Sequence, residues 1–135
     1  MAGSVGDKYY DVFLEYRLWL STKKGKGILG EGRINLLKEI ERTGSLKSAS
    51  ENLKISYRKA WGNIKEAEEL LGFKLVEKQR GGKDGGNSQL SEEGKQLLAA
   101  YNELKMDFDR SIKKITKKFF HKINEPLENV SDTND

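Results

Sequence analysis

The residues best suited to bind an anionic partner lie between positions 54 and 65, where four basic residues occur without any acidic one. On a helical wheel, one side of this segment carries Arg58, Lys59, Gly62 and Lys65, and the other carries Tyr57 and the apolar residues. The glutamate-rich stretch 66–69 follows directly, so the segment is positive at its start and negative at its end. This polarity suits a helix whose first turn points into a groove lined with phosphates.

Within this segment Arg58 is the residue best able to read a base. A guanidinium can donate two hydrogen bonds to guanine, worth about 1–3 kcal/mol of discrimination, whereas serine, lysine and tyrosine side chains suit phosphates or single base contacts. The same side chains also fit an ordinary solvated helix face, and the segment alone leaves both interpretations open. The candidate DNA contacts here and at the start of the preceding predicted helix are Ser45, Lys47, Ser56, Tyr57, Arg58 and Lys59.

Two other residues of the segment are expected to pack inside the protein. Trp61 lies at the edge of the apolar side, and we predict it to belong to the core. Gly62 costs about 1 kcal/mol in a helix interior relative to alanine. We attribute it to close packing against a neighbouring element rather than to close approach of DNA.

The glycine-rich stretch 80–87, RGGKDGGN, has two competing interpretations besides that of a plain loop. A phosphate-binding P-loop requires Gly-Lys-Ser/Thr opening a helix, but here Lys83 is followed by Asp84 and then by a predicted strand. The stretch fits the tip of a hairpin, or wing, because glycine keeps the turn slim and permits positive φ. Arg80 and Lys83 can then contact the DNA backbone or its minor groove.

The elements around these residues follow from periodicity. Alternating residues over Asp11–Ser21 predict a strand, which Ile28 and Leu29 pair with to form an N-terminal β-hairpin. From Glu31 the spacing becomes helical and continues until Thr43, where Gly44 stops it.

Two further helices follow closely in sequence and predict a helix-turn-helix. Ser45 is a suitable N-cap for a short helix over 46–53, and Ser56 for a helix over 57–71 that Gly72 ends. The segments 74–79 and 88–90 are predicted to be the two strands of the wing.

A last helix is predicted over 91–123, with Ser91 as its N-cap. Apolar residues recur in it at steps of three and four, so they form one stripe. From about Phe108 onward this stripe needs a partner, and the simplest one is the same helix of a second copy of the chain. The predicted dimerisation residues are Tyr101, Leu104, Phe108, Ile112, Ile115 and Phe119.

These elements predict a mainly α fold with a small β component, a winged helix-turn-helix with an N-terminal β-hairpin and a long C-terminal dimerisation helix. The expected organisation is a flexible N-terminus 1–7, a DNA-binding domain 8–104, the helix 91–123 that overlaps it, and a disordered tail 124–135.

Composition argues against several other functions. The chain has no cysteine and one histidine, His121, so it lacks disulfides, thiolate nucleophiles and the usual ligand sets for zinc. Acidic residues are scattered among lysines without a catalytic constellation, and we therefore expect no enzymatic activity, no metal and no cofactor. No apolar run reaches the ~18 residues of a membrane span and no secretory signal pattern occurs, so we expect a cytoplasmic protein. The net charge of +4 is compatible with nucleic-acid binding.

Over about residues 32–101 the chain resembles the N-terminal DNA-binding domain of ModE-type molybdate-responsive regulators, and more distantly the winged domain of LysR-type regulators. The most specific parts are 55–61 (ISYRKAW), 75–77 (LVE) and the glycine-rich stretch. The resemblance implies that the first of these opens the recognition helix, so that Ser56 to Lys59 face DNA. It also implies that Arg80 and Lys83 serve the wing and that the long helix helps to form the dimer.

The resemblance carries two departures. The family continues into molybdate-binding domains, and none fits within Asn124–Asp135, so we expect this chain to have no small-molecule effector. Asp84 replaces a frequent glycine and should alter only the wing tip. The sequence thus predicts a homodimeric transcriptional regulator that binds double-stranded DNA, with helix 57–71 in the major groove and wing 80–87 on the backbone or minor groove. The alternative is a winged-helix module that binds another protein instead of a specific DNA sequence.

Overall fold

The computed structural model describes residues 8–78 and 87–127. These residues divide into two units, one formed by Arg17–Glu103 and the other by the segments 8–16 and 104–127. The predictions for the N-terminus 1–7, for Arg80, Lys83 and the rest of the wing tip up to position 86, and for 128–135 of the tail fall outside the described residues.

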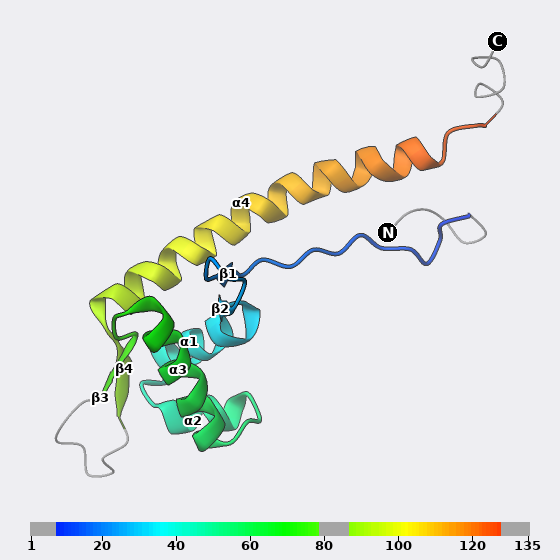
Figure 1. The fold of residues 1–135 in the computed structure, drawn as a ribbon. Coiled ribbons are helices and arrows are strands. Elements are labelled where there is room, and N and C mark those ends of the chain that lie inside the picture. Colours follow the sequence, from blue (N-terminus) through cyan, green and yellow to red (C-terminus); the bar gives the residue numbers. More distant parts are fainter. Residues whose placement is uncertain (1–7, 79–86, 128–135) are drawn as a thin grey trace. The chain divides into compact units, whose positions relative to one another are not determined.

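The fold is mainly helical, and its strands pair only into two small antiparallel hairpins, β1 with β2 and β3 with β4. This confirms the predicted winged helix-turn-helix class, with a hairpin before the first helix and a long helix after the wing. In chain order the elements are β1 Leu20–Ser21, β2 Gly27–Leu29, α1 Glu31–Thr43, α2 Leu46–Asn52, α3 Tyr57–Leu71, β3 Val76–Lys78, β4 Ser88–Leu90 and α4 Glu92–Ile123 (Figure 1).

Serine side chains set the starts of α2 and α3, as predicted. The Ser45 hydroxyl accepts a hydrogen bond from the backbone N–H of Ser48 at 3.1 Å. The Ser56 hydroxyl accepts one from the backbone N–H of Lys59 at 3.0 Å. Each hydroxyl satisfies one of the donors that a helix leaves unpaired in its first turn, which stabilises the helix by about 0.5–2 kcal/mol relative to alanine.

Glycines end α1 and α3. Gly44 has φ 73° and Gly72 has φ 86°, both in the left-handed region where glycine meets no Cβ penalty. Their backbone N–H groups donate to Ile40 and Glu68, at 2.8 Å in each case. The C-terminal boundaries predicted at Thr43 and Leu71 are confirmed.

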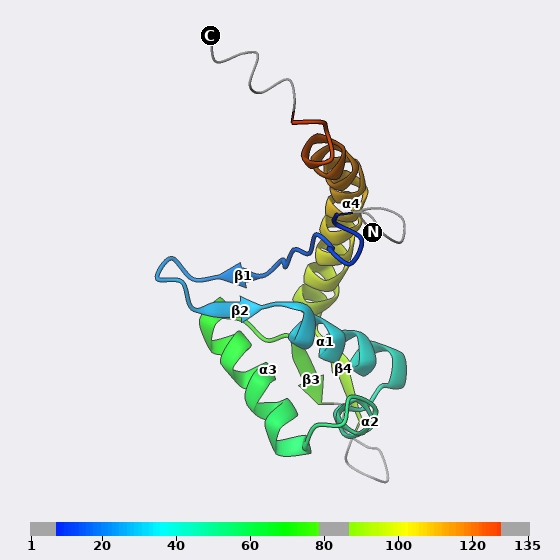
Figure 2. The same cartoon turned by 90° about the vertical axis from the view of Figure 1, so that its right-hand side faces the viewer.

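The core of Arg17–Glu103 lies among the three short helices, the strands and the start of α4. Helix α1 packs on α2 and β4, and α3 packs on α2 and β2 (Figure 2). The most completely buried large side chains are Leu29, Ile34, Leu36, Leu37, Ile40, Leu46, Ile64 and Leu75. This packing anchors one side of α3 and leaves its other side outward.

The predicted strand over Asp11–Ser21 is wrong for most of its length, since only Leu20–Ser21 is a strand. Leu20 pairs with Leu29 and Ser21 with Gly27, and the chain enters α1 at Glu31. The partner strand therefore ends before it can pair with residues preceding Leu20. The predicted strand 74–79 is also shorter in the structure, at Val76–Lys78, with position 79 outside the described residues.

Within the described residues, no helix combines the length and the apolar character needed to cross a bilayer.

Candidate nucleic-acid interface

A tight turn joins α2 to α3 and fixes where α3 begins. Lys54 adopts φ 58°, an uncommon left-handed conformation for a residue other than glycine. The backbone N–H of Ile55 donates to the carbonyl of Ser50 at 3.0 Å, and the Ile55 side chain packs against the core. The turn thus directs the chain outward at Ser56, where α3 starts.

Helix α3 has the two faces that the wheel predicts, except that Tyr57, which the wheel places on the packing side, is exposed. Ala60, Ile64 and Ala67 are at most 1% exposed and hold the helix against the core. The opposite face is exposed, and it carries Arg58, Lys59, Gly62 and Lys65. Two small alanines on the buried side let the helix pack closely while its basic side stays in solvent.

The first turn of α3 presents all four of its predicted contacts to solvent. Ser56, Tyr57, Arg58 and Lys59 are exposed, and the Tyr57 side chain is 45% exposed. Although Ser56 accepts the capping hydrogen bond, a hydroxyl keeps its own hydrogen to donate. This turn therefore offers a guanidinium, an ammonium and two hydroxyls on one exposed surface.

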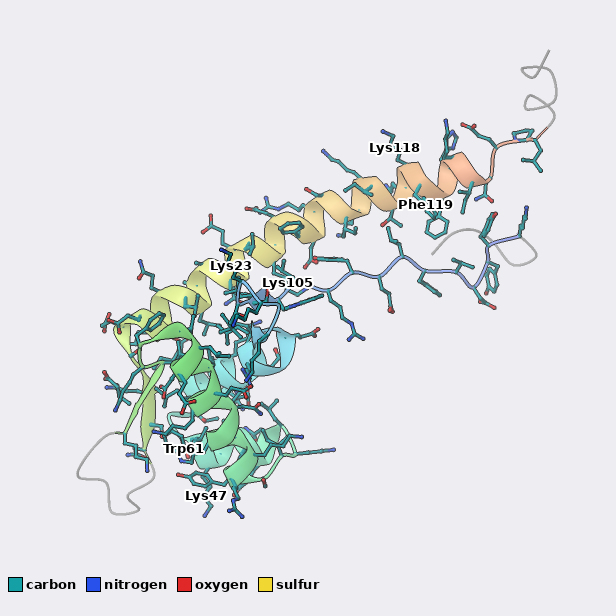
Figure 3. The ribbon with its side chains drawn as sticks, viewed as in Figure 1. Lys23, Lys47, Trp61, Lys105, Lys118 and Phe119 are labelled. Atoms are coloured by element: carbon teal, nitrogen blue, oxygen red, sulfur yellow. The ribbon has the colours of Figure 1, made fainter. Side chains whose placement is uncertain are left out.

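The two predicted contacts from α2 differ from each other. Lys47 is exposed and lies at the same end of its unit as Trp61 (Figure 3). Ser45 is half-buried, caps α2 and forms an antiparallel bridge with Asn87. Its structural role explains its presence without DNA.

Gly62 does not pack against another element, contrary to the prediction. A Cβ built at this position would meet nothing within 4 Å among the described residues. The residue is exposed in the middle of the basic face of α3. Close packing therefore does not account for this glycine, and the other interpretation, close approach of DNA, is taken up under the proposed function.

Trp61 packs against the core as predicted, but at its edge, so that part of the side chain stays exposed. It is half-buried and makes an edge-to-face contact with Tyr57, with ring centroids 6.4 Å apart. The ammonium groups of Lys65 and Lys78 lie 5.4 and 4.9 Å from its ring centroid. These distances are typical of cation–π contacts, so Trp61 links α3 to β3.

Glu66, in the second half of α3, forms a contact with another element of the fold. The Glu66 carboxylate accepts a hydrogen bond from the Arg33 guanidinium at 2.5 Å, and this bond lowers the pKa of Glu66. The same guanidinium donates to the carbonyl of Ile28 at 2.7 Å. Through Arg33, Glu66 thereby connects α3 to α1 and β2. The sequence analysis considered Glu66 only as part of the negative end of the helix and missed this contact.

Glu68 holds the start of the wing stem. Its Oε2 accepts hydrogen bonds from the backbone N–H groups of Leu75 at 2.7 Å and Val76 at 3.2 Å. Sequence spacing gives no signal for this contact, because the chain must first turn at Gly72.

The first residue of the predicted dimerisation stripe on α4, Tyr101, is buried within the chain itself. Tyr101 is 4% exposed, and its hydroxyl donates to the carbonyl of Leu18 at 2.7 Å. Leu98, which the stripe omitted, is 3% exposed in the same core. We therefore remove Tyr101 from the predicted interface, because its side chain is not available to a second copy.

Farther along α4 the stripe is open to solvent. Leu104, Phe108, Ile115 and Phe119 are between 37% and 54% exposed, and Ile112 is half-buried. Phe108, Ile112 and Ile115 line one apolar hollow together with Asp107 and Ser111.

The segment 8–16 attaches to this part of α4 through Tyr16. The Tyr16 hydroxyl donates to the Asp109 carboxylate and lowers the pKa of Asp109, and the rings of Tyr16 and Phe108 lie 6.3 Å apart.

For the part of the chain that the structure describes, no three His, Cys, Asp or Glu residues come together as possible metal ligands.

Comparison with known proteins gives one family for the region that contains α1 to the start of α4. Residues 32–95 match the family described as bacterial regulatory helix-turn-helix protein, lysR family. "Molybdenum transport protein ModE" of Azotobacter vinelandii is 32% identical over 102 residues, which cover 76% of this chain and 37% of the relative. "DNA-binding transcriptional dual regulator ModE" of Escherichia coli (strain K12) is 40% identical over 72 residues, covering 53% of this chain and 28% of the relative.

The chain therefore spans less than two fifths of the length of these curated relatives. Among solved structures, ArgP from Mycobacterium tuberculosis aligns with a TM-score of 0.48 at 18% identity, over 62% of this chain and 29% of that one.

Proposed function

We propose that the chain binds double-stranded DNA sequence-specifically as a homodimeric transcriptional regulator, because residues 32–95 match the lysR-family helix-turn-helix model and are similar to ModE-type regulators. In this proposal the start of α3 enters the major groove and the wing 80–87 contacts the backbone or minor groove.

The observation that carries the proposal is the first turn of α3. Its contact residues are exposed on one surface, and the buried alanines and Ile64 anchor the opposite side of the helix. Arg58 is assigned to a base edge, and Lys59, Ser56 and Lys47 to phosphates. Gly62 leaves the middle of the face open to close approach by the duplex.

The dimer is proposed on the exposed stripe Leu104, Phe108, Ile112, Ile115 and Phe119. Apolar side chains at this spacing on one helix suit burial against the same stripe of a second copy. Two copies would then present two α3 helices to a two-fold symmetric site.

The first test compares the wild type with Arg58→Ala on DNA selected from a random pool. Wild-type affinity should weaken steeply with salt, with log K falling by about 0.9 per unit of log[salt] for each phosphate neutralised. In Arg58→Ala, the difference in binding free energy between selected and unrelated sites should shrink by about 1–3 kcal/mol. The affinity for unrelated duplex should fall less. Fluorescence anisotropy at several salt concentrations measures both quantities.

One result would reject the proposal, and another would reject only the role assigned to Arg58. A shallow salt slope for the wild type would favour a protein-binding winged helix instead. An unchanged site preference in Arg58→Ala would remove this side chain from base recognition. Lys38→Gln, which removes one charge from the exposed surface of α1, serves as the control for a nonspecific effect of charge.

A further inference from the structure

A groove between α3 and β3 lies beside the proposed recognition surface, and no DNA contact has been assigned to its residues above. Trp61 and Lys65 of α3 line it on one side, and Val76 and Lys78 of β3 on the other. Lys74, in the connection between α3 and β3, is the third lysine that lines the groove. We refer to it as the α3–β3 groove.

Trp61 holds two of these lysines in place. The ammonium groups of Lys65 and Lys78 lie within 5.4 Å of its ring centroid, although they come from different elements. A cation over an indole face is attracted by the ring quadrupole, which restricts two otherwise flexible side chains. Both lysines remain exposed, so their ammonium hydrogens can be donated to a ligand in the groove.

The acidic side chains of the groove offset this charge only in part. Glu68 lines it too, but its Oε2 is directed to the backbone N–H groups of Leu75 and Val76. Glu77, between Val76 and Lys78 in β3, lines the groove as well. Three lysines against these two glutamates leave the groove cationic.

The Trp61 ring also connects the groove to the start of α3. Its edge-to-face contact with Tyr57 places the two aromatic rings next to each other on that helix. A DNA strand that passes the first turn of α3 can therefore continue along the groove without leaving the basic surface.

We propose that the α3–β3 groove binds consecutive phosphates of one DNA strand, with Lys65 and Lys78 each neutralising one phosphate and Trp61 acting as the positioning residue for both. This inference rests on the proposed function, since it assigns further contacts to the same duplex. The contacts fix how α3 sits on the duplex and carry no sequence information.

The test uses the Lys65→Gln/Lys78→Gln double variant of the full chain. Loss of two phosphate contacts should reduce the salt slope of log K by about 1.8 and lower the affinity at 0.1 M salt by about 60-fold. The ranking of DNA sequences should stay as in the wild type. The matched control is Lys38→Gln/Lys95→Gln, which removes the same charge from exposed positions outside the groove and should leave the slope nearly unchanged.

A second readout reports directly on the groove. The chain contains two tryptophans, so Trp19→Phe leaves Trp61 as the only one. In this background the two groove substitutions should reduce quenching of Trp61 by the anion iodide more than quenching by neutral acrylamide. Addition of duplex DNA should protect Trp61 from iodide.

The outcomes separate this inference from the function on which it depends. A wild type that binds duplex with a steep salt slope, together with a groove variant of unchanged slope or a Trp61 that DNA does not protect from iodide, overturns the groove and leaves the proposed function standing. A wild type without salt-dependent duplex binding overturns both.

Discussion

Two helical glycines show how much a single missing Cβ can matter in this chain. At Gly62 a Cβ would meet open space, whereas at Gly94 it would come within 2.4 Å of the carbonyl oxygen of Leu75. That carbonyl cannot retreat easily, because it accepts the backbone N–H of Ser91 at 2.9 Å. Gly94 is therefore required for α4 to start against the wing stem, and Gly62 is not required by the fold.

Alanine should have opposite effects at these two positions. Gly62→Ala should raise the free energy of unfolding by about 0.5–1 kcal/mol, because alanine favours the helix. Gly94→Ala should lower it by about 1–3 kcal/mol despite the same propensity gain, because the methyl group overpacks the contact with Leu75. Urea denaturation of both variants measures the difference.

The DNA affinity of the same variants checks the proposed surface. Gly62→Ala should bind duplex less well although it is more stable, since its methyl group lies on the face assigned to DNA. If Gly62→Ala is destabilised, the open space at this position is contradicted.

At the scale of the elements, local signals were enough to predict the helices. Ser45 and Ser56 begin helices and Gly44 and Gly72 end them because capping depends on one side chain or one φ angle. Such information lies within a few residues of the boundary, and the sequence therefore contains it in full.

Contacts between distant segments were beyond the reach of the same reasoning. The alternation over 11–19 resembles a strand, but β2 is too short to pair with it. The partners of Glu66 and Glu68 lie on other elements, and both Tyr101 and the unnoticed Leu98 are core residues of α4. For the candidate site, the exposed first turn of α3 was predicted, whereas the Trp61 link to β3 was not.

The exposed stripe of α4 gives a prediction at this scale. Ile115→Asp should shift the protein from dimer to monomer, because it places a charge in the proposed apolar interface. Met106→Asp is the matched control, since Met106 is 60% exposed on the same helix and lies about 160° around it from Phe108. Light scattering over a range of protein concentrations measures the shift. An Ile115→Asp protein that remains dimeric places the interface elsewhere.

For the whole molecule, the proposed pairing of two chains has a geometric consequence on DNA. Two α3 helices related by a two-fold axis must meet half-sites on the same side of the duplex, one helical turn or a multiple of it apart.

Inserting about 5 base pairs between the half-sites should therefore abolish cooperative binding, because it rotates one half-site to the opposite side. Inserting about 10 should restore part of the affinity. An isolated half-site provides the reference, and footprinting of the set measures occupancy. Equal binding to all spacings would mean that each chain reads DNA independently.

The two hydrogen bonds that Glu68 accepts from the backbone of Leu75 and Val76 also bear on how α3 and the hairpin stem could fit a duplex. Because a carboxylate of α3 accepts hydrogen bonds from two backbone N–H groups at the base of β3, these bonds help to hold the spacing between the helix and the hairpin stem. If the chain binds a duplex as proposed, we expect the nucleic acid to bend or twist to fit this spacing. The affinity would then differ between stiff and flexible DNA sequences, even at base pairs that no side chain contacts.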